Sequence, residues 1–252
     1  MCYRYVLQRE ALEALAARLA VPRAVDWSSR FNLAPGESVL VVRRRAGADA
    51  RSLEMVRLRW GLLPAWTKDV ATATAPANAR AEGLACRPMF REAFRRRRCL
   101  IPAGGFYEWR DQNRRRQPYL FRMRDGSPLG LAGLWESWRG PDGGPAVETC
   151  AIVTTPPNEL VRPIHDRMPA ILAAEEIERW LDPRLTEPGE LAPLLHPFAA
   201  GAMTAIPVTT RVNNTRFEDP ACLEPAPLAS GGDESAQMTL QFDESVPTGG
   251  SD

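Results

Sequence analysis

The chain has few histidines, a single lysine and no long apolar run. Its two histidines, His165 and His196, are too few for a histidine-rich metal centre. The cysteines are far apart and form no C-x-x-C pair, which argues against a disulfide framework and against a zinc site. We therefore expect reduced thiols, no bound metal and no cofactor. The cysteines are Cys2, Cys86, Cys99, Cys150 and Cys222.

Apolar stretches of the ~18 to 20 residues needed to span a membrane are absent, and the N-terminus lacks the apolar core of a signal peptide. We expect a cytoplasmic protein without a membrane partner. The 252 residues are 44% hydrophobic and 25% charged, which is enough for one sizeable core. One domain followed by a tail is the simplest organisation.

Charge is distributed unevenly along the chain. Residues after Arg216 include eight acidic side chains and no basic one, so residues 1–216 hold all 32 basic side chains against 23 acidic ones, a net charge of +9. This balance is compatible with a polyanionic ligand, although solvated surface arginines would explain it equally well. Arginine suits phosphate oxygens but cannot form an imine, so only Lys68 and the N-terminal amine could form a Schiff base.

The first two residues, Met1 and Cys2, suggest covalent chemistry. Removal of Met1, by initiator processing or by the protein's own thiol, would leave Cys2 with a free α-amine beside its thiol. An α-amine has a pKa of ~7.7 to 8.0 against ~10.4 for lysine, so it forms imines readily at neutral pH. Where local charge favours some thiolate, the thiol can then close a thiazolidine ring, and the natural partner is an aldehyde. Many proteins carry cysteine at this position by chance.

Hydrophobic spacing predicts both helices and strands. Leu12, Leu15, Ala16 and Leu19 share one face of a helix over residues 8–20. Two β-like runs joined at a glycine-containing loop, residues 39–43 and 53–60, predict a hairpin. Further helices are expected at 89–94 and 173–181, further strands at 119–124, 129–138 and 147–154, and a last strand and turn over 206–214.

Two central segments carry candidate acid–base residues. Glu108 is surrounded by Phe106, Tyr107 and Trp109, and a carboxyl group held against aromatic surface becomes competent for proton transfer near pH 7. The alternative is that Glu108 points outward from a half-buried strand. His165 lies in a proline-bracketed turn beside Asp166, where a catalytic and a structural histidine are about equally expected.

Other segments are ambiguous. Trp60 and Trp66 bracket an irregular loop, where tryptophans more often pack in the core or at its rim than stack on bases. The polar cluster 78–82, Asn-Ala-Arg-Ala-Glu, suits either a close ligand approach or a surface turn. The arginine run 95–98 is expected to be a solvated basic face, with phosphate contact as the sharper alternative.

Taken together, six short motifs in order resemble the SRAP family, the SOS-response-associated peptidases understood as sensors of abasic sites in single-stranded DNA. The resemblance covers roughly residues 2–214. One departure is Tyr3, where the family usually has glycine, and it puts in doubt how tightly a DNA strand passes the terminus. The motifs are Cys2 with Arg4, residues 30–35, 60–66, 78–82, 99–109 and 164–169.

The resemblance implies an α+β fold: a single compact domain, residues 2–216, built on curved, mostly antiparallel, barrel-like sheet with peripheral helices. It also implies that Cys2 crosslinks to the ring-opened sugar of an abasic site, shielding the strand from cleavage during the DNA damage response. Asn78, Glu108 and His165 would surround Cys2. The expected DNA contacts are Arg4, Arg80, Arg167, Trp60 and Trp66, with the protein acting as a monomer.

Three rival functions share some of these features. A peptidase or amidohydrolase could use Cys2 as an N-terminal nucleophile. A non-covalent binder of single-stranded DNA would not need Cys2 at all. A β-lyase would cleave abasic DNA through Lys68, the only lysine.

Residues 217–252 form an acidic segment rich in proline, glycine and serine, for which we expect disorder. Within it, Gln237, Leu240 and Phe242 match a Q-x-x-L-x-F pattern that resembles ligands of the bacterial DNA sliding clamp. A six-residue pattern is weak, but nothing else in a disordered segment needs these apolar residues for a core.

Overall fold

The computed structural model describes residues 2–21, 26–45, 52–70, 72–112, 115–141 and 143–226. A closed five-stranded barrel lies at its centre, because each of five strands pairs with two of the others. Four of the five pairings are antiparallel, and the ring closes where β10 runs parallel to β4, with Thr149 opposite Arg59. The strands are β3 (Ser38–Arg44), β4 (Leu53–Trp60), β6 (Arg98–Ala103), β9 (Leu129–Trp138) and β10 (Val147–Thr155).

Two short strands extend the barrel along β10. β5 (Asn78–Arg80) pairs with it in parallel, and β11 (Met168–Pro169) pairs with it in the antiparallel sense. β5 carries Asn78, and β11 begins three positions after His165, so the end of β10 lies between two segments that are distant in the chain.

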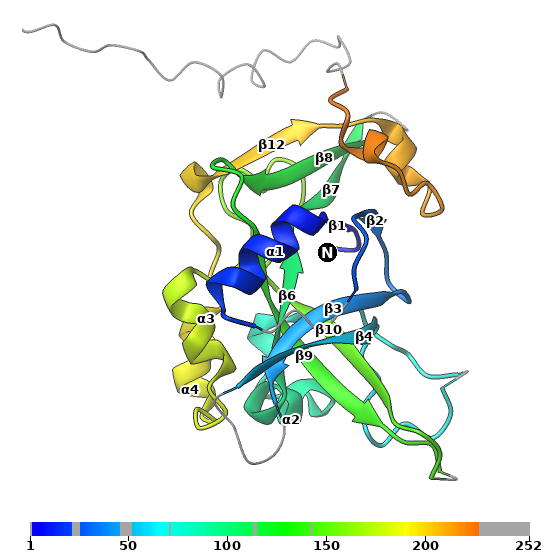
Figure 1. The fold of residues 1–252 in the computed structure, drawn as a ribbon, viewed down its shortest axis with the longest axis vertical. Helices are drawn as coiled ribbons and strands as arrows, with labels where there is room; N and C mark the ends of the chain where they lie inside the picture. The colour runs from blue at the N-terminus through cyan, green and yellow to red at the C-terminus, as the bar shows by residue number, and fades with distance from the viewer. Residues whose placement is uncertain are drawn as a thin grey trace, which may run out of the picture.

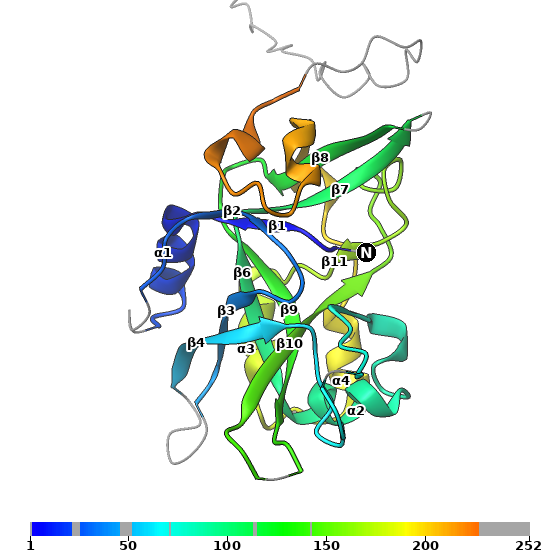
Figure 2. The same ribbon diagram turned by 90° about the vertical axis from the view of Figure 1, so that its right-hand side faces the viewer.

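A second, antiparallel sheet lies beside the barrel (Figures 1 and 2). The junction is Gly104–Gly105, where β6 of the barrel passes into β7. A side chain at Gly105 would place its Cβ only 2.7 Å from the carbonyl oxygen of Phe121, so this crossing requires glycine. In order, the sheet contains β12 (Met203–Pro207), β8 (Arg115–Met123), β7 (Gly105–Gln112), β1 (Tyr5–Leu7) and β2 (Arg30–Leu33).

Helices lie on the outside of these sheets (Figure 1). The predicted apolar face of α1 is confirmed, because Leu12, Leu15 and Ala16 are buried. Proline occupies the first turn of α2, where a missing N–H costs nothing. The helices are α1 (Arg9–Arg18), α2 (Pro88–Arg96), α3 (Ala174–Leu181) and α4 (Pro188–Leu191), with short 3-10 turns at Ala81–Gly83, Ala192–Leu194, Ala200–Ala202, Thr210–Asn213 and Pro220–Leu223.

The predicted α+β class and the predicted hairpin are both confirmed, since β3 and β4 pair from Ser38–Arg59 to Arg44–Leu53. The expected domain boundary at residue 216 is too early. Glu218 accepts hydrogen bonds from the backbone of Phe31 and Asn32, and Cys222 is fully buried. Residues 217–226 therefore belong to the folded domain, whereas the rest of the expected disordered segment lies outside the described residues.

Candidate functional site

The chain start lies against β7. The Tyr107 N–H donates to the carbonyl oxygen of Arg4 at 3.0 Å, which continues the β1–β7 pairing toward the terminus. Cys2 is thereby fully buried, and its Sγ lies 3.7 Å from the Arg4 carbonyl oxygen. Burial, together with the negative charge of Glu108, raises the pKa of the Cys2 thiol. The sulfur is therefore protonated in this environment at neutral pH.

Glu108 is buried within β7 and does not point into solvent. Glu108 is only 2% exposed, so the alternative of an outward-facing glutamate is wrong. Burial raises the pKa of Glu108 to about 7, because the ionised form loses hydration. Near neutral pH the carboxyl group is thus divided between acid and base forms, as proton transfer requires.

His165 faces Glu108 from another part of the chain. Its Nε2 lies 3.7 Å from Glu108 Oε2. His165 Nδ1 lies 3.0 Å from the backbone N–H of Arg167, 3.0 Å from Asp166 Oδ1 and 3.2 Å from the Arg167 carbonyl oxygen. Burial lowers the pKa of His165, which favours the neutral imidazole at pH 7.

Asn78 has an unusual environment for a buried amide. The residue is 8% exposed, and neither its Oδ1 nor its Nδ2 has a hydrogen-bond partner among the described residues. The bond from Trp60 Nε1 to the Ala77 carbonyl oxygen, 2.8 Å, holds the start of its strand. An unpaired buried amide costs roughly 1–3 kcal/mol, a cost that a polar ligand would remove.

The structure thus brings Cys2, Glu108 and His165 together. Charge interaction links the first two, and the 3.7 Å approach links the second and third. Asn78 lies on β5, opposite Ile152 of β10, and within the described chain no hydrogen bond joins it to the other three. Cys2, Glu108 and His165 therefore form a group of a thiol, a buried carboxyl group and an imidazole, and Asn78 adds an unpaired amide on β5.

The three arginines expected at DNA differ in their surroundings. Arg80 is exposed on β5. Arg4 is half-buried and donates to Asn32 Oδ1 at 2.9 Å and to the Val212 carbonyl oxygen at 3.0 Å. The prediction for Arg167 is wrong, because its side chain is buried and its guanidinium group is bound to other groups of the protein.

Arg167 forms a two-pronged ion pair with Glu82 at 2.6 and 3.0 Å, and donates a third bond to the carbonyl oxygen of Thr154 at 2.6 Å. Binding a phosphate would require breaking this arrangement. Its role is to tie the loop carrying His165 to the segment that follows β5.

The two tryptophans also differ. Trp60 is 1% exposed and lies edge-on to Tyr5, with ring centroids 5.3 Å apart, so it belongs to the core and cannot stack on a base. Trp66 is 58% exposed and available to a ligand.

The arginine run at residues 95–98 is not a uniform basic face. Arg98 is buried, and its guanidinium donates to five backbone carbonyl oxygens. Arg97 pairs with Glu136 at 2.6 Å. The side chain of Arg98 therefore joins the end of α2 to the segment after α3. The five acceptors are Phe94, Arg95, Trp180, Asp182 and Leu185.

No role in the site was expected for Arg116, and Trp109 was expected only as an aromatic neighbour of Glu108. The ring of Trp109 has the guanidinium groups of Arg4 and Arg116 each 5.8 Å from its centroid, and its Nε1 donates to Asn213 Oδ1 at 2.6 Å. Burial has the largest effect on the pKa of Glu108 and on that of His165, and the charge of Arg116 also acts on both. The arginine run at residues 114–116 was the available signal in the sequence.

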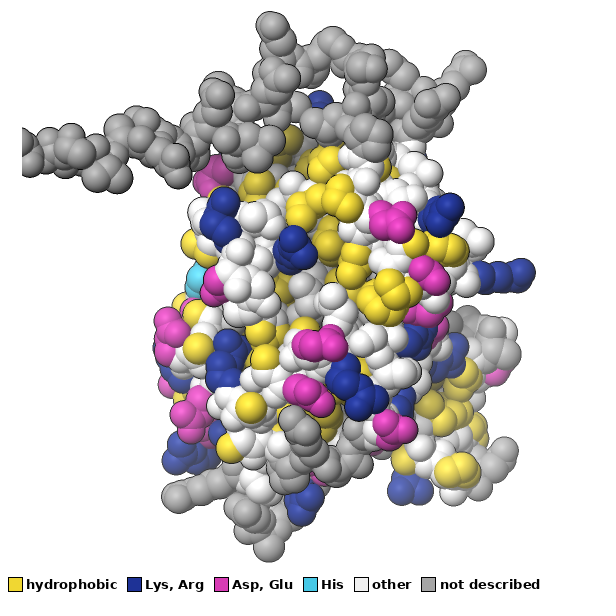
Figure 3. Space-filling model, turned by 45° about the horizontal axis from the view of Figure 1, so that its top comes forward, with side chains coloured by type: hydrophobic (Ala, Val, Ile, Leu, Met, Phe, Trp, Pro, Cys, Tyr) yellow, Lys and Arg dark blue, Asp and Glu magenta, His cyan; other side chains and the backbone are white. Residues whose placement is uncertain are grey.

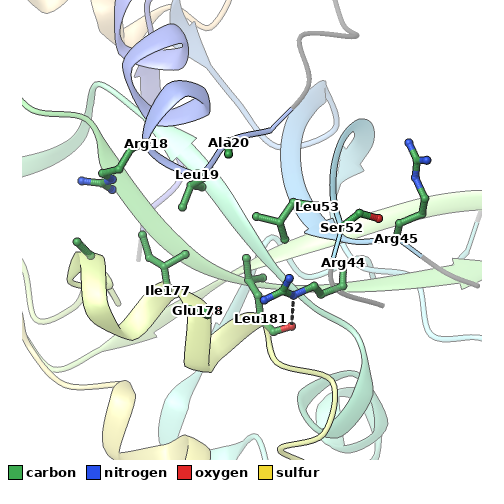
Figure 4. Close-up of a pocket in the computed structure, with 11 residues that line it drawn as sticks. Arg18, Leu19, Ala20, Arg44, Arg45, Ser52, Leu53, Ile177, Glu178 and Leu181 are labelled. Carbon is green, nitrogen blue, oxygen red and sulfur yellow. Dashed lines mark hydrogen bonds between the residues drawn. The ribbon is translucent and has the colours of Figure 1, made fainter. Parts of the chain in front are cut away.

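Charge and cavities do not by themselves locate the site. On the face shown in Figure 3, basic and acidic side chains are interspersed with exposed hydrophobic groups. A cavity of about 520 Å³ lies between α1, the β3–β4 hairpin and α3, and contains none of the candidate residues. Leu19, Leu53, Ile177 and Leu181 line it beside Arg44 (Figure 4).

The part of the chain that the structure describes contains no helix able to cross a membrane. Nor does that part contain a group of three or more metal-binding side chains.

Comparison with known proteins gives consistent matches. Residues 1–215 match the family model described as SOS response associated peptidase (SRAP). The chain is 36% identical to the Abasic site processing protein YoqW of Bacillus subtilis over 228 residues, covering 89% of this chain and 99% of the relative. It is 31% identical to the Abasic site processing protein HMCES of Xenopus tropicalis, covering 78% and 66% of the two chains. A crystal structure of a protein from Bacteroides thetaiotaomicron matches with a TM-score of 0.79 and 29% identity, covering 90% and 100%.

Proposed function

The chain belongs to the SOS response associated peptidase family, and from this premise we propose that it captures abasic sites in single-stranded DNA as a covalent adduct of Cys2. The observation that carries the proposal is the juxtaposition of Cys2, Glu108 and His165, with a carboxyl group whose pKa is raised to about 7 beside the nucleophile. The relatives' names, which refer to abasic site processing, support the same substrate.

The reaction needs no oxidant or cofactor. Once Met1 is removed, the α-amine of Cys2 adds to the C1′ aldehyde of the ring-opened deoxyribose. The resulting carbinolamine loses water to give an imine. The thiol then adds to the imine carbon, while its proton passes to the nitrogen, and a thiazolidine ring results. The adduct therefore equals protein plus DNA minus one water.

Glu108 is suited to move the protons in these steps. In its acid form it can protonate the departing hydroxyl group, and in its base form it can accept a proton from the amine. A pKa near the working pH provides both forms, because neither one dominates. Burial is the main source of the raised pKa, and the negative charge of Asp166 also raises it.

His165 and Asn78 are assigned to the sugar and the amine. The imidazole of His165, whose Nε2 lies 3.7 Å from Glu108 Oε2, can donate to the sugar oxygen at C4′ as the ring opens. The unpaired amide of Asn78 can accept from the α-amine and hold its lone pair toward C1′. A polar group that has no hydrogen-bond partner inside the protein breaks no hydrogen bond when it binds substrate.

Ring closure also explains why the strand would be protected. An imine at C1′ withdraws electrons and acidifies the C2′ proton, whose loss expels the 3′ phosphate. The thiazolidine carbon is saturated, so this electron sink disappears and the phosphate stays attached. A β-lyase would stop at the imine and cleave.

Exposed Arg80 and half-buried Arg4 are our candidates for phosphate contacts, and exposed Trp66 for stacking on a nearby base. Such contacts favour single strands without reading sequence. Specificity comes from the aldehyde that only a missing base provides.

The test is intact mass spectrometry of the full-length protein mixed with a single-stranded oligonucleotide that contains one abasic site. We expect the mass of protein without Met1 plus oligonucleotide minus water. A tetrahydrofuran analogue, which has no aldehyde, is the matched control and should give no adduct. An adduct that persists in Cys2→Ala would overturn the proposal.

The same samples separate the rival functions. Strand cleavage lost in Lys68→Arg but kept in Cys2→Ala would indicate a β-lyase. Hydrolysis of added peptides that requires Cys2 would indicate an N-terminal-nucleophile peptidase. Equal binding and protection by Cys2→Ala would indicate a non-covalent binder.

For a protein partner, we propose the DNA sliding clamp, through Gln237, Leu240 and Phe242, which lie outside the described residues. The support is the sequence pattern within an acidic segment. A peptide of residues 233–247 should bind a bacterial clamp, whereas the same peptide carrying Leu240→Ala and Phe242→Ala should not. Equal binding of the two peptides would contradict this partner.

A further inference from the structure

Tyr3 is an exposed aromatic residue directly beside the nucleophile. Among the described residues, the exposed large hydrophobic side chains are Tyr3, at 42%, and Trp66, at 58%. The other tyrosines are buried, as is Cys2 itself. An aromatic ring left in water next to a buried reactive group is a candidate contact for whatever that group binds.

The position of Tyr3 limits what its ring can reach. Consecutive Cα atoms are ~3.8 Å apart, so the Cα of Tyr3 lies at that distance from the Cα of Cys2, the residue whose amine and thiol would hold the sugar. The hydrogen bond between Tyr107 N–H and the Arg4 carbonyl oxygen holds this segment beside β7, next to Glu108. Stacked bases follow one another at ~3.4 Å along a strand, so the bases flanking the captured sugar are the nearest DNA groups.

An abasic nucleotide leaves a gap the size of one base. Each flanking base has lost a stacking partner on one side, and its exposed face is flat and apolar. A tyrosine ring has a matching flat face, while its hydroxyl group can stay in water. Base–aromatic stacking tolerates any base, because every base offers a π-face.

Building on the proposed function, we propose that Tyr3 takes the place of the missing base: when Cys2 holds C1′, the Tyr3 ring stacks on a base that flanks the abasic site. Tyr3 is then a specificity residue. In an intact strand the base itself fills the same space, so the ring and the base exclude one another. The side chain thus favours abasic strands before any covalent bond forms.

The test uses the fluorescence of 2-aminopurine, which stacking quenches. The full-length protein and its Tyr3→Ala and Tyr3→Phe variants are crosslinked to oligonucleotides with 2-aminopurine on either side of the abasic site. We expect quenched emission with the native protein and with Tyr3→Phe, and emission several-fold higher with Tyr3→Ala on one side. An oligonucleotide with 2-aminopurine far from the site is the control and should not respond.

Equal emission from the native and Tyr3→Ala adducts would overturn the inference, as would an equal change in the distant probe. A denaturing gel of the same samples reports adduct formation. No adduct with the native protein would contradict the proposed function itself, whereas an adduct with unaltered emission would contradict only the role of Tyr3.

A second measurement does not depend on the crosslink. In a Cys2→Ala background, we expect the protein to bind a strand containing the tetrahydrofuran analogue about 10-fold more tightly than an intact strand. Adding Tyr3→Gly should abolish this preference, and adding Tyr3→Phe should retain it. A preference that survives Tyr3→Gly would also overturn the inference.

Discussion

Glu108 Oε2 and His165 Nε2 lie 3.7 Å apart, although one belongs to β7 and the other to a loop that leads into β11. Burial raises the pKa of the first group to about 7 and lowers the pKa of the second. At neutral pH the imidazole is therefore mainly neutral, whereas the carboxyl group is divided between its acid and base forms. Their pH behaviour is directly measurable.

Glu108→Gln should change how stability depends on pH. The folded protein holds the Glu108 proton up to about pH 7, whereas the unfolded chain releases it near the ordinary glutamate pKa of 4.5. The free energy of unfolding therefore falls as pH rises through this window, by about 3 kcal/mol. The variant should lack this fall and be more stable than the native protein at pH 8.

Denaturant unfolding at pH 4, 6 and 8 measures the effect. Glu10→Gln, which removes an exposed carboxylate, is the matched control. If the native protein and Glu108→Gln lose stability in parallel between pH 4 and 8, the buried carboxyl group does not titrate as described. The rate of adduct formation should show the complementary loss, falling by ~10²- to 10⁴-fold in Glu108→Gln at pH 7.

Asn78→Leu should raise stability while lowering activity. Its amide has no hydrogen-bond partner among the described residues, so an apolar side chain of similar size removes an unpaid desolvation cost of about 1–2 kcal/mol. Adduct yield on abasic DNA should fall in the same variant. Thermal unfolding and denaturing gels measure the two effects.

Asn158→Leu is the matched control for that experiment. This buried asparagine donates to the Phe198 carbonyl oxygen at 2.8 Å and accepts from the Val161 N–H at 3.0 Å. Its replacement should destabilise the protein, because both partners lose their bonds. If Asn78→Leu proves as destabilising as Asn158→Leu, the amide of Asn78 is structurally satisfied and the ligand argument for it fails.

Arg80 and Arg167 should respond differently to salt. We expect Arg80→Met to weaken binding of single-stranded DNA and to reduce the slope of log affinity against log salt by about 1. Arg167→Met should leave the slope unaltered but lower the free energy of unfolding by about 2–4 kcal/mol, since it removes the ion pair to Glu82 and a bond to a buried carbonyl. Fluorescence anisotropy in a Cys2→Ala background measures the slope.

Trp60→Ala and Trp66→Ala should separate packing from binding. The first removes a ring buried against Tyr5 and should cost about 3–5 kcal/mol of stability. The second should alter stability by less than about 0.5 kcal/mol and weaken single-strand binding by about 1–3 kcal/mol. Unfolding and anisotropy measurements on both variants decide the matter, and unaltered DNA binding by Trp66→Ala would remove that residue from the interface.

Local features of the chain were predictable from the sequence alone. The helical spacing of Leu12 and Leu15 predicts the buried face of α1, and alternating runs on either side of residue 47 predict the β3–β4 hairpin. Each of these depends on interactions between residues that are close in sequence, so the pattern itself contains the information.

Only the tertiary structure decided which of several similar side chains are buried or paired with other groups of the protein. Trp60 and Trp66 lie six positions apart, yet one is in the core and the other in solvent. The guanidinium group of Arg98 donates to carbonyl oxygens and that of Arg167 pairs with Glu82, whereas Arg80 remains exposed. Their partners come from distant segments, which no local pattern specifies.

The same holds for the site as a whole. The sequence by itself determined that a cysteine, a glutamate and a histidine of suitable chemistry are present. Closure of the barrel through β10, and the antiparallel pairing of the chain start with β7, decided that they meet. Proximity arises from long-range strand pairing, and the burial that this pairing produces is what raises the pKa of Glu108 to about 7.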